Sequence, residues 1–133
     1  MTLDEAARRW LGTPWRHLGR NRAGVDCIGL ILLSALECGH DVPDPAPYAR
    51  EPSDNRLVQG IQEHATRVGA AEPGDVLVFR WGRLAAHVGI ASVHPVYGGP
   101  SVIHAAAKYG TVCEHLMAAD ILAAHVATYR IRG

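Results

Sequence analysis

The segment that decides the fold is Asp26-Cys27-Ile28-Gly29-Leu30-Ile31-Leu32-Leu33-Ser34-Ala35-Leu36-Glu37-Cys38-Gly39. Asp26 is a favourable helix N-cap, and Gly39 is of the residue type that most often follows a helix end. Apolar side chains surround almost the whole helical projection between them, which is typical of a helix buried inside a domain. We therefore expect a central helix over about residues 27–38, capped by Asp26.

The chain before this helix is predicted to form an amphipathic helix and then a loop. Thr2 and Glu5 have the spacing of a capping box, and the helical pattern stops at Gly12 and Pro14. The apolar residues of this pattern are Leu3, Ala6, Ala7, Trp10 and Leu11. Residues 12–25 are rich in glycine and basic residues, which indicates a loop. The basic residues of this loop, which either grip a substrate carboxylate or, by default, face water, are Arg16, His17, Arg20 and Arg22.

The chain after the central helix changes from helical to strand patterns. Prolines between residues 43 and 52 predict an extended connector, and Ser53 can cap a third helix that runs to Val68 and is ended by Gly69. From Pro73 onward, short apolar runs alternate with turn residues, as in strands. The predicted strands cover residues 76–79, 87–91, 101–105, 111–116 and 125–131, with a short helix at 118–124.

Helices first and strands second predict an α+β fold with a five-stranded, mostly antiparallel sheet. A chain of 133 residues is the size of one domain, and no internal repeat or linker divides it, so we expect residues 1–133 to form a single domain.

Charge and hydropathy narrow the classes of partner. Thirteen basic and 13 acidic residues give zero formal charge, so no broad field attracts nucleic acid or an anionic membrane. No window reaches the roughly 18 apolar residues of a membrane span, and the start of the chain lacks the pattern of a signal peptide. We therefore expect a protein that is synthesised in the cytoplasm and not exported by a signal peptide.

Three cysteines cannot all pair within the chain, so we expect free thiols rather than a disulfide framework. Cys27 falls on the first turn of the central helix, where free N–H groups and the helix dipole stabilise a thiolate. Position alone does not separate this role from that of a small buried apolar residue. Cys38 lies at the electronegative end of the same helix and Cys113 in a strand, so both are predicted to be core residues.

Two histidines on neighbouring predicted strands are candidates to act with Cys27. Period two puts His87 on one strand face with Gly89 and Ala91. Because these neighbours are small, we expect the central helix to pack close to this face and to bring Cys27 within reach of the His87 imidazole. His104, on the next strand, is the candidate to orient His87 from behind. A structural histidine bonded to a carbonyl is the alternative for His87.

A metal site is the rival use of the same three side chains. Zinc could bind Cys27, His87 and His104, yet the sequence has no Cys-x-x-Cys or His-x-x-x-His pair to start such a site. We therefore expect no metal and no other cofactor.

Five ordered blocks resemble one known family. They are Gly12-Thr13-Pro14-Trp15, Gly24-Val25-Asp26-Cys27-Ile28-Gly29-Leu30, Pro73-Gly74-Asp75-Val76-Leu77, His87-Val88-Gly89-Ile90 and Ile103-His104-Ala105. Their sequence and order resemble the NlpC-type (NlpC and p-sixty) family of papain-like cysteine peptidases. The Gly-Thr-Pro-Trp-Arg-His variant is most similar to members encoded with tail genes in prophages and gene transfer agents.

The resemblance implies a papain-like fold and cleavage of peptidoglycan stem peptides, commonly between D-γ-glutamyl and a diamino acid. By motif position it makes Cys27 the nucleophile, His87 the base and His104 the orienting residue. It further implies peptidoglycan as partner and, for the tail-associated members, phage-like tail proteins that carry the enzyme to the wall.

Two positions depart from the family pattern. Many members have tyrosine where this chain has Trp15 and serine where it has Ile28. Trp15 retains one N–H donor, so it either helps to hold the oxyanion or forms a wall of the cleft. Asp26 either caps the helix only or also holds the free amine of the substrate.

Two alternatives keep the fold and change the function. The chain could be a tail-assembly component with a vestigial site, although Cys27, His87 and His104 are all present. It could also be an amidase or acyltransferase that acts on a lipid or another small amide, although nothing resembles a membrane anchor.

Overall fold

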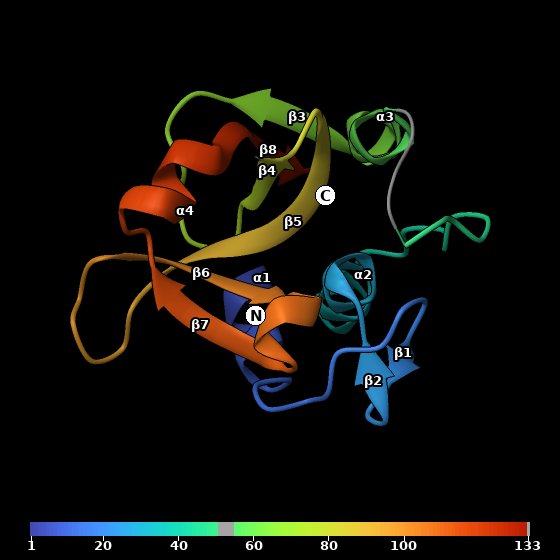
Figure 1. Cartoon of the computed structure of the whole chain (residues 1–133), viewed down its shortest axis with the longest axis horizontal. Coiled ribbons are helices and arrows are strands. Elements are labelled where there is room, and N and C mark those ends of the chain that lie inside the picture. The colour runs from blue at the N-terminus through green and yellow to red at the C-terminus, as the bar shows by residue number, and fades with distance from the viewer. Residues whose placement is uncertain (51–54, 133) are drawn as a thin grey trace.

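The computed structural model describes residues 1–50 and 55–132, and its main feature is a six-stranded antiparallel sheet with helices on both of its faces (Figure 1). The helices are α1 (Leu3–Arg8), α2 (Cys27–Glu37), α3 (Arg56–His64), the 3₁₀ turn η1 (Ala107–Tyr109) and α4 (Ala119–Ala124). The strands are β1 (Arg20–Asn21), β2 (Gly24–Val25), β3 (Ala65–Val68), β4 (Val76–Trp81), β5 (Leu84–Val93), β6 (Pro100–Ala105), β7 (Val112–Leu116) and β8 (His125–Ile131). The main sheet has the order β3-β8-β4-β5-β6-β7, and β1 and β2 form a small separate hairpin.

The α+β prediction is confirmed, and its elements lie close to where the sequence indicates. Helix α2 begins at Cys27 as expected, and the five predicted strands correspond to β4 to β8. The short helix expected at 118–124 is α4. The first helix is shorter than its apolar pattern, since α1 ends at Arg8 and turns follow it.

The sheet has one strand more than predicted, because the third helix ends early. Helix α3 stops at His64, and residues 65–68 form β3, which pairs with β8 from Ala65↔Ile131 to Val68↔Thr128. A strand edge supplied by β8 satisfies the backbone of these residues, and this long-range pairing overrides their helical pattern. The predicted cap Ser53 lies outside the described residues.

Alternation along the strands separates two clusters of buried side chains. Val76, Val78, Val88 and Ile90 face α1 and α2 and pack with residues such as Leu30. The opposite face of the sheet carries Leu77, Phe79, Ala91 and Val102, packed against Met117, Ile121 and Ala124 at α4. The central helix therefore rests on the valine-rich face of the sheet.

This arrangement corrects the expected role of the bare strand face around His87. A Cβ on Gly89 would lie 2.4 Å from Val102 Cγ2 and 3.2 Å from His104 Cβ, so side chains of β6 fill this space and α2 does not. Continuing the β5–β6 register beyond Ile90↔Ile103 sets His104 opposite Gly89. The small residue thus makes room for His104.

The Pro-Gly-Asp turn is tied to the last strand by a buried carboxylate. Arg130 donates two hydrogen bonds to Asp75, of 2.8 and 2.9 Å, and the backbone N–H of Glu72 donates a third. Asp75 is only 2% exposed, so these donors compensate the loss of its hydration. The turn therefore links the start of β4 to β8.

All three cysteines are free thiols, in agreement with the sequence. None of the helices in the described ranges is long and apolar enough to cross a membrane.

We predict that Gly89→Ala lowers the free energy of unfolding by about 1–3 kcal/mol, because the added methyl group overpacks the gap filled by Val102 and His104. Denaturant titration of the purified variant measures the change. Gly60→Ala is the matched control, since its Cβ meets nothing within 4 Å in α3 and the exchange is expected to add about 0.4–1 kcal/mol. Equal stabilities of the Gly89 variant and the wild type would contradict the packing argument.

Candidate active site

The start of α2 is fixed by the carboxylate of Asp26, as the sequence predicts. Asp26 Oδ1 accepts the backbone N–H of Gly29 at 2.8 Å, which caps the helix. The other oxygen, Oδ2, accepts from Leu18 N at 2.9 Å. The carboxylate therefore attaches the preceding loop to the helix that carries Cys27.

Gly29 explains why the Asp-Cys-x-Gly pattern needs a residue without a side chain. A Cβ there would lie 2.3 Å from the carbonyl oxygen of Gly19. The loop can cross the first turns of α2 this closely only because Gly29 is bare.

Cys27 lies in a cleft that also contains His87. The cleft has a volume of about 1560 Å³, and its walls include Trp15, Asp26, Tyr48, Trp81 and Lys108. Backbone N–H groups of Val88, Ile28 and Cys27 itself lie next to the sulfur. The structure thus brings Cys27 beside the strand residue that follows His87.

The pKa of the Cys27 thiol is raised to about 12, chiefly because the group is buried. The N–H groups of Val88, Ile28 and Cys27 lower it, and the negative charge of Asp26 raises it further. The residue as a whole is partly exposed and lines the cleft. The helix-start donors that the sequence indicated are present, but burial outweighs them, and the resting thiol is neutral.

His87 and His104 form a direct hydrogen bond, with 2.8 Å between His87 Nε2 and His104 Nδ1. Both residues are buried, with exposed fractions of 3% and 1%. The Trp81 ring stacks on His87 with 4.1 Å between centroids and 7° between planes. This pairing leaves Nδ1 of His87 as the nitrogen that can take a proton from a thiol.

Burial keeps both imidazoles neutral. Desolvation, with help from His104 and Lys108, lowers the pKa of His87 well below its usual value. Desolvation and the neighbouring groups His115 and Lys108 lower the pKa of His104 to about 4. A neutral His87 is a base at neutral pH, which is the state that proton abstraction requires.

Trp15 and Asp26 both line the cleft, but their environments differ. The Trp15 ring is partly exposed, and the guanidinium carbon of Arg50 lies 4.8 Å from its centroid. Asp26 is only 4% exposed. Its oxygens accept hydrogen bonds from Gly29, Leu18, Arg20 and Tyr48. The capping role of Asp26 is confirmed, and a role in holding a substrate amine stays a prediction.

Tyr48 is a member of the site that the sequence did not single out. Its hydroxyl donates to Asp26 Oδ2 at 2.5 Å and accepts from Arg20 at 2.8 Å. Burial and the bond to Asp26 raise its pKa, so it remains a donor. Tyr48 lies in the proline-rich connector, where no periodicity marks which side chain turns inward.

Arg20 departs from the expectation that the loop charges face water, whereas Arg16 and Arg22 are exposed as expected. Its guanidinium bonds Asp26 at 3.0 Å and Asp44 at 3.0 Å. Arg22 lies over the Trp10 ring, 3.6 Å from its centroid. Both residues thus hold the loop onto the body of the domain.

The described residues do not gather Cys27, His87 and His104 as ligands for one metal ion. The cluster with metal-ligand spacing is instead His104, Cys113 and His115. Cys27 and His87 line the cleft, and the buried His104 is hydrogen-bonded to His87. A thiol beside a neutral imidazole that a second group orients is the combination of side chains that nucleophilic catalysis by cysteine uses.

Comparisons with known proteins concern the family and the fold. The model of the "NlpC/P60 family" matches residues 12–130. The "Probable endopeptidase NlpC" of Escherichia coli (strain K12) is 27% identical over 117 residues, which cover 83% of this chain and 64% of that protein. The chain therefore spans less than two thirds of the length of this relative.

A solved structure with a similar fold is the "Crystal structure of NlpC/p60 domain of peptidoglycan hydrolase SagA". The TM-score is 0.67 at 21% identity, and the match covers 98% of this chain and 97% of that one. This likeness concerns the fold. Because the family model covers nearly the whole chain, including Cys27, His87 and His104, the protein belongs to the NlpC/P60 family.

Proposed function

We propose that the protein is a cysteine peptidase that hydrolyses peptidoglycan stem peptides at the bond between D-γ-glutamyl and a diamino acid. The observation that carries this proposal is that Cys27 and His87 line one cleft, with His87 hydrogen-bonded to the buried His104. The names of two relatives, an endopeptidase and a peptidoglycan hydrolase, support the class of substrate. The choice of bond rests on the sequence resemblance alone.

The first half of the reaction is attack on the acyl carbon. As the Cys27 sulfur approaches the carbonyl, its proton passes to Nδ1 of His87, since both groups are neutral at rest. The imidazolium then carries protons on both nitrogens and donates through Nε2 to His104 Nδ1. His104 therefore stabilises the charged state that forms only during the reaction.

The second half releases the products. The tetrahedral anion is held by backbone N–H groups at the start of α2, and Trp15, which lines the same cleft, can add its indole N–H. His87 returns its proton to the departing amine, which leaves a thioester on Cys27. Water, activated by the same imidazole, hydrolyses the thioester and restores the thiol.

We also propose that a phage-like tail delivers the protein to the wall. The support is the Gly12-Thr13-Pro14-Trp15-Arg16-His17 variant, which resembles tail-associated members of the family. Tail proteins would then be its protein partners and the particle its place of action.

Exchange of Cys27 for alanine is expected to lower turnover at least about 1000-fold, since no other group can form the thioester. The assay is digestion of a panel of defined muropeptides followed by mass spectrometry, which also identifies the bond. Cys38→Ala, at the opposite end of α2, is the matched control and should retain turnover. Wild-type turnover in the Cys27 variant would refute the nucleophile assignment.

Exchange of His104 for alanine should lower kcat by roughly 10- to 1000-fold with little change in KM, because the imidazolium of His87 loses its acceptor. His104→Asn retains an acceptor oxygen and should restore part of the rate. A melting curve of each variant separates this effect from loss of fold.

The pH profile gives the second readout for the same pair. Because burial lowers the pKa of His87, wild-type kcat/KM should stay on its plateau below pH 6.5 and fall only when the base becomes protonated. An unchanged rate and profile in the alanine variant would exclude an orienting role.

The delivery proposal predicts that the protein copurifies with phage-like particles after density-gradient separation. Mass spectrometry of the particle fraction and immunogold labelling of the tail are the measurements. A protein found only outside the particles would contradict the proposal and would leave the proposed chemistry intact.

A further inference from the structure

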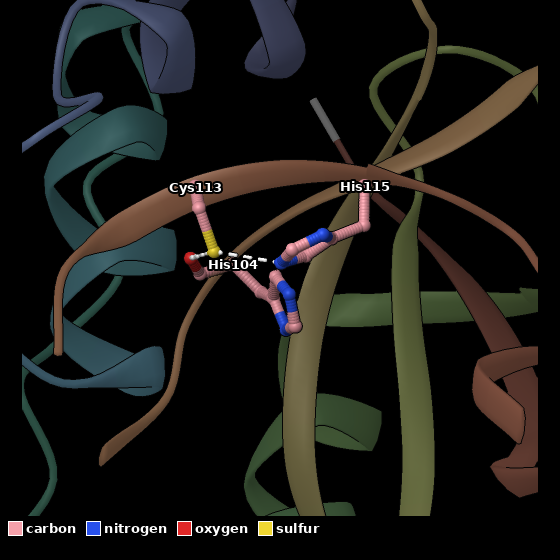
Figure 2. Close-up of side chains that lie close together, drawn as sticks. All are labelled: His104, Cys113 and His115. Carbon is pink, nitrogen blue, oxygen red and sulfur yellow. Dashed lines mark hydrogen bonds between the residues drawn. The ribbon is translucent and has the colours of Figure 1, made fainter. Parts of the chain in front are cut away.

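A second cluster of chemically reactive side chains shares His104 with the candidate active site and extends from it to β7. Figure 2 shows His104 on β6 turned toward Cys113 and His115 on β7. The β6–β7 register pairs His104 with Cys113 and Val102 with His115, so all three side chains leave the sheet on one face. Their ligand atoms lie within 4.8 Å of one another, and Cys113 Sγ is 3.1 Å from His115 Nε2.

One atom of this cluster is buried without a hydrogen-bond partner among the described residues. Nδ1 of His104 bonds His87, while Nε2 of His104 is buried and unpaired. A buried polar nitrogen without a partner costs about 1–3 kcal/mol, so a ligand for this nitrogen would be stabilising. Cys113 and His115 remain partly exposed, which leaves the cluster open to ions from solvent.

We propose that His104 Nε2, Cys113 Sγ and His115 Nε2 form an inhibitory binding site for Zn²⁺. One thiolate and two imidazoles are the ligands that zinc prefers, and three protein ligands leave a fourth position for water. Tetrahedral zinc with these ligands needs separations of roughly 3.3–3.6 Å. The ligand atoms lie up to 4.8 Å apart. Side-chain rotations that move them by about an ångström bring them to the separations that zinc needs.

The charges around the cluster favour binding of moderate strength. Cys113 loses its proton to solvent on binding, so the site contributes one negative charge against the two positive charges of the ion. Lys108 acts electrostatically on His104 and opposes a cation. Glu114 lies on the opposite face of β7, where its carboxylate accepts hydrogen bonds from Arg8 and Ser101. It therefore adds no ligand to the proposed site.

Zinc at His104 Nε2 would reverse the proton arrangement that the reaction needs. This step rests on the proposed function. A neutral imidazole bound through Nε2 carries its proton on Nδ1, and it then donates to Nε2 of His87. His87 in turn carries its single proton on Nδ1 and cannot accept one from Cys27. Each ring keeps one proton, but on the nitrogen that disables the base.

The binding experiment is independent of activity. Cobalt(II), as a spectroscopic substitute for zinc, is titrated into the Cys27→Ala variant to exclude the catalytic thiol. We expect one equivalent to bind with a thiolate-to-cobalt charge-transfer band, which zinc displaces. The band should vanish on further exchange of Cys113 for alanine and persist on exchange of Cys38. No band, or a band lost with Cys38, would overturn the site.

The inhibition experiment uses the protein with Cys27 intact. Zinc should inhibit muropeptide hydrolysis, or alkylation of Cys27 if no substrate is turned over, and chelator should reverse it. Cys113→Ala and His115→Gln should keep the basal rate and raise the inhibitory zinc concentration at least tenfold. Equal inhibition of the wild type and both variants would show that zinc acts at Cys27 and His87 instead. That result would refute the proposal.

Discussion

The carboxylate of Asp26 is the constraint on which the site depends. It accepts four hydrogen bonds, from Gly29, Leu18, Arg20 and Tyr48. These donors come from α2, the preceding loop and the proline-rich connector, so one buried group joins three segments around Cys27. The same charge raises the pKa of the thiol that it positions. Asp26 therefore fixes the start of the helix and holds the sulfur in place, and the same negative charge disfavours the thiolate.

The burial of His87 compensates for the raised pKa of the Cys27 thiol, because it keeps the imidazole neutral and able to accept a proton. Desolvation disfavours both the thiolate and the imidazolium, so the resting site holds a neutral pair. In the proposed mechanism, charge develops only when a substrate oxyanion and its backbone donors are present. The bond to His104 acts at that moment, since a doubly protonated His87 must donate through Nε2. Stacking of Trp81 on the imidazole holds the ring in the required plane.

The sequence predicts the parts of the site better than their packing. Capping at Asp26 and alternation around His87 are local, and both are read correctly from neighbouring residues. The strand at Ala65 does not follow from the sequence, because its partner residue in β8, Ile131, lies more than 60 residues away in the chain. The sequence indicates a gap at Gly89, but only the register of β6 decides that His104 fills it. Tyr48 does not stand out, because an irregular connector has no period that marks an inward side chain.

The same register explains why the strand face around His87 and the cluster of His104, Cys113 and His115 are linked. Alternation puts His87 and Gly89 on one face of β5, and His104 comes opposite Gly89, diagonal to His87. On the other side of β6, His104 is opposite Cys113. A histidine in the middle of three strands has two ring nitrogens and two neighbours, one on each side. The tautomer that one neighbour selects is therefore imposed on the other, and whatever binds Nε2 of His104 acts on the base through a single shared ring.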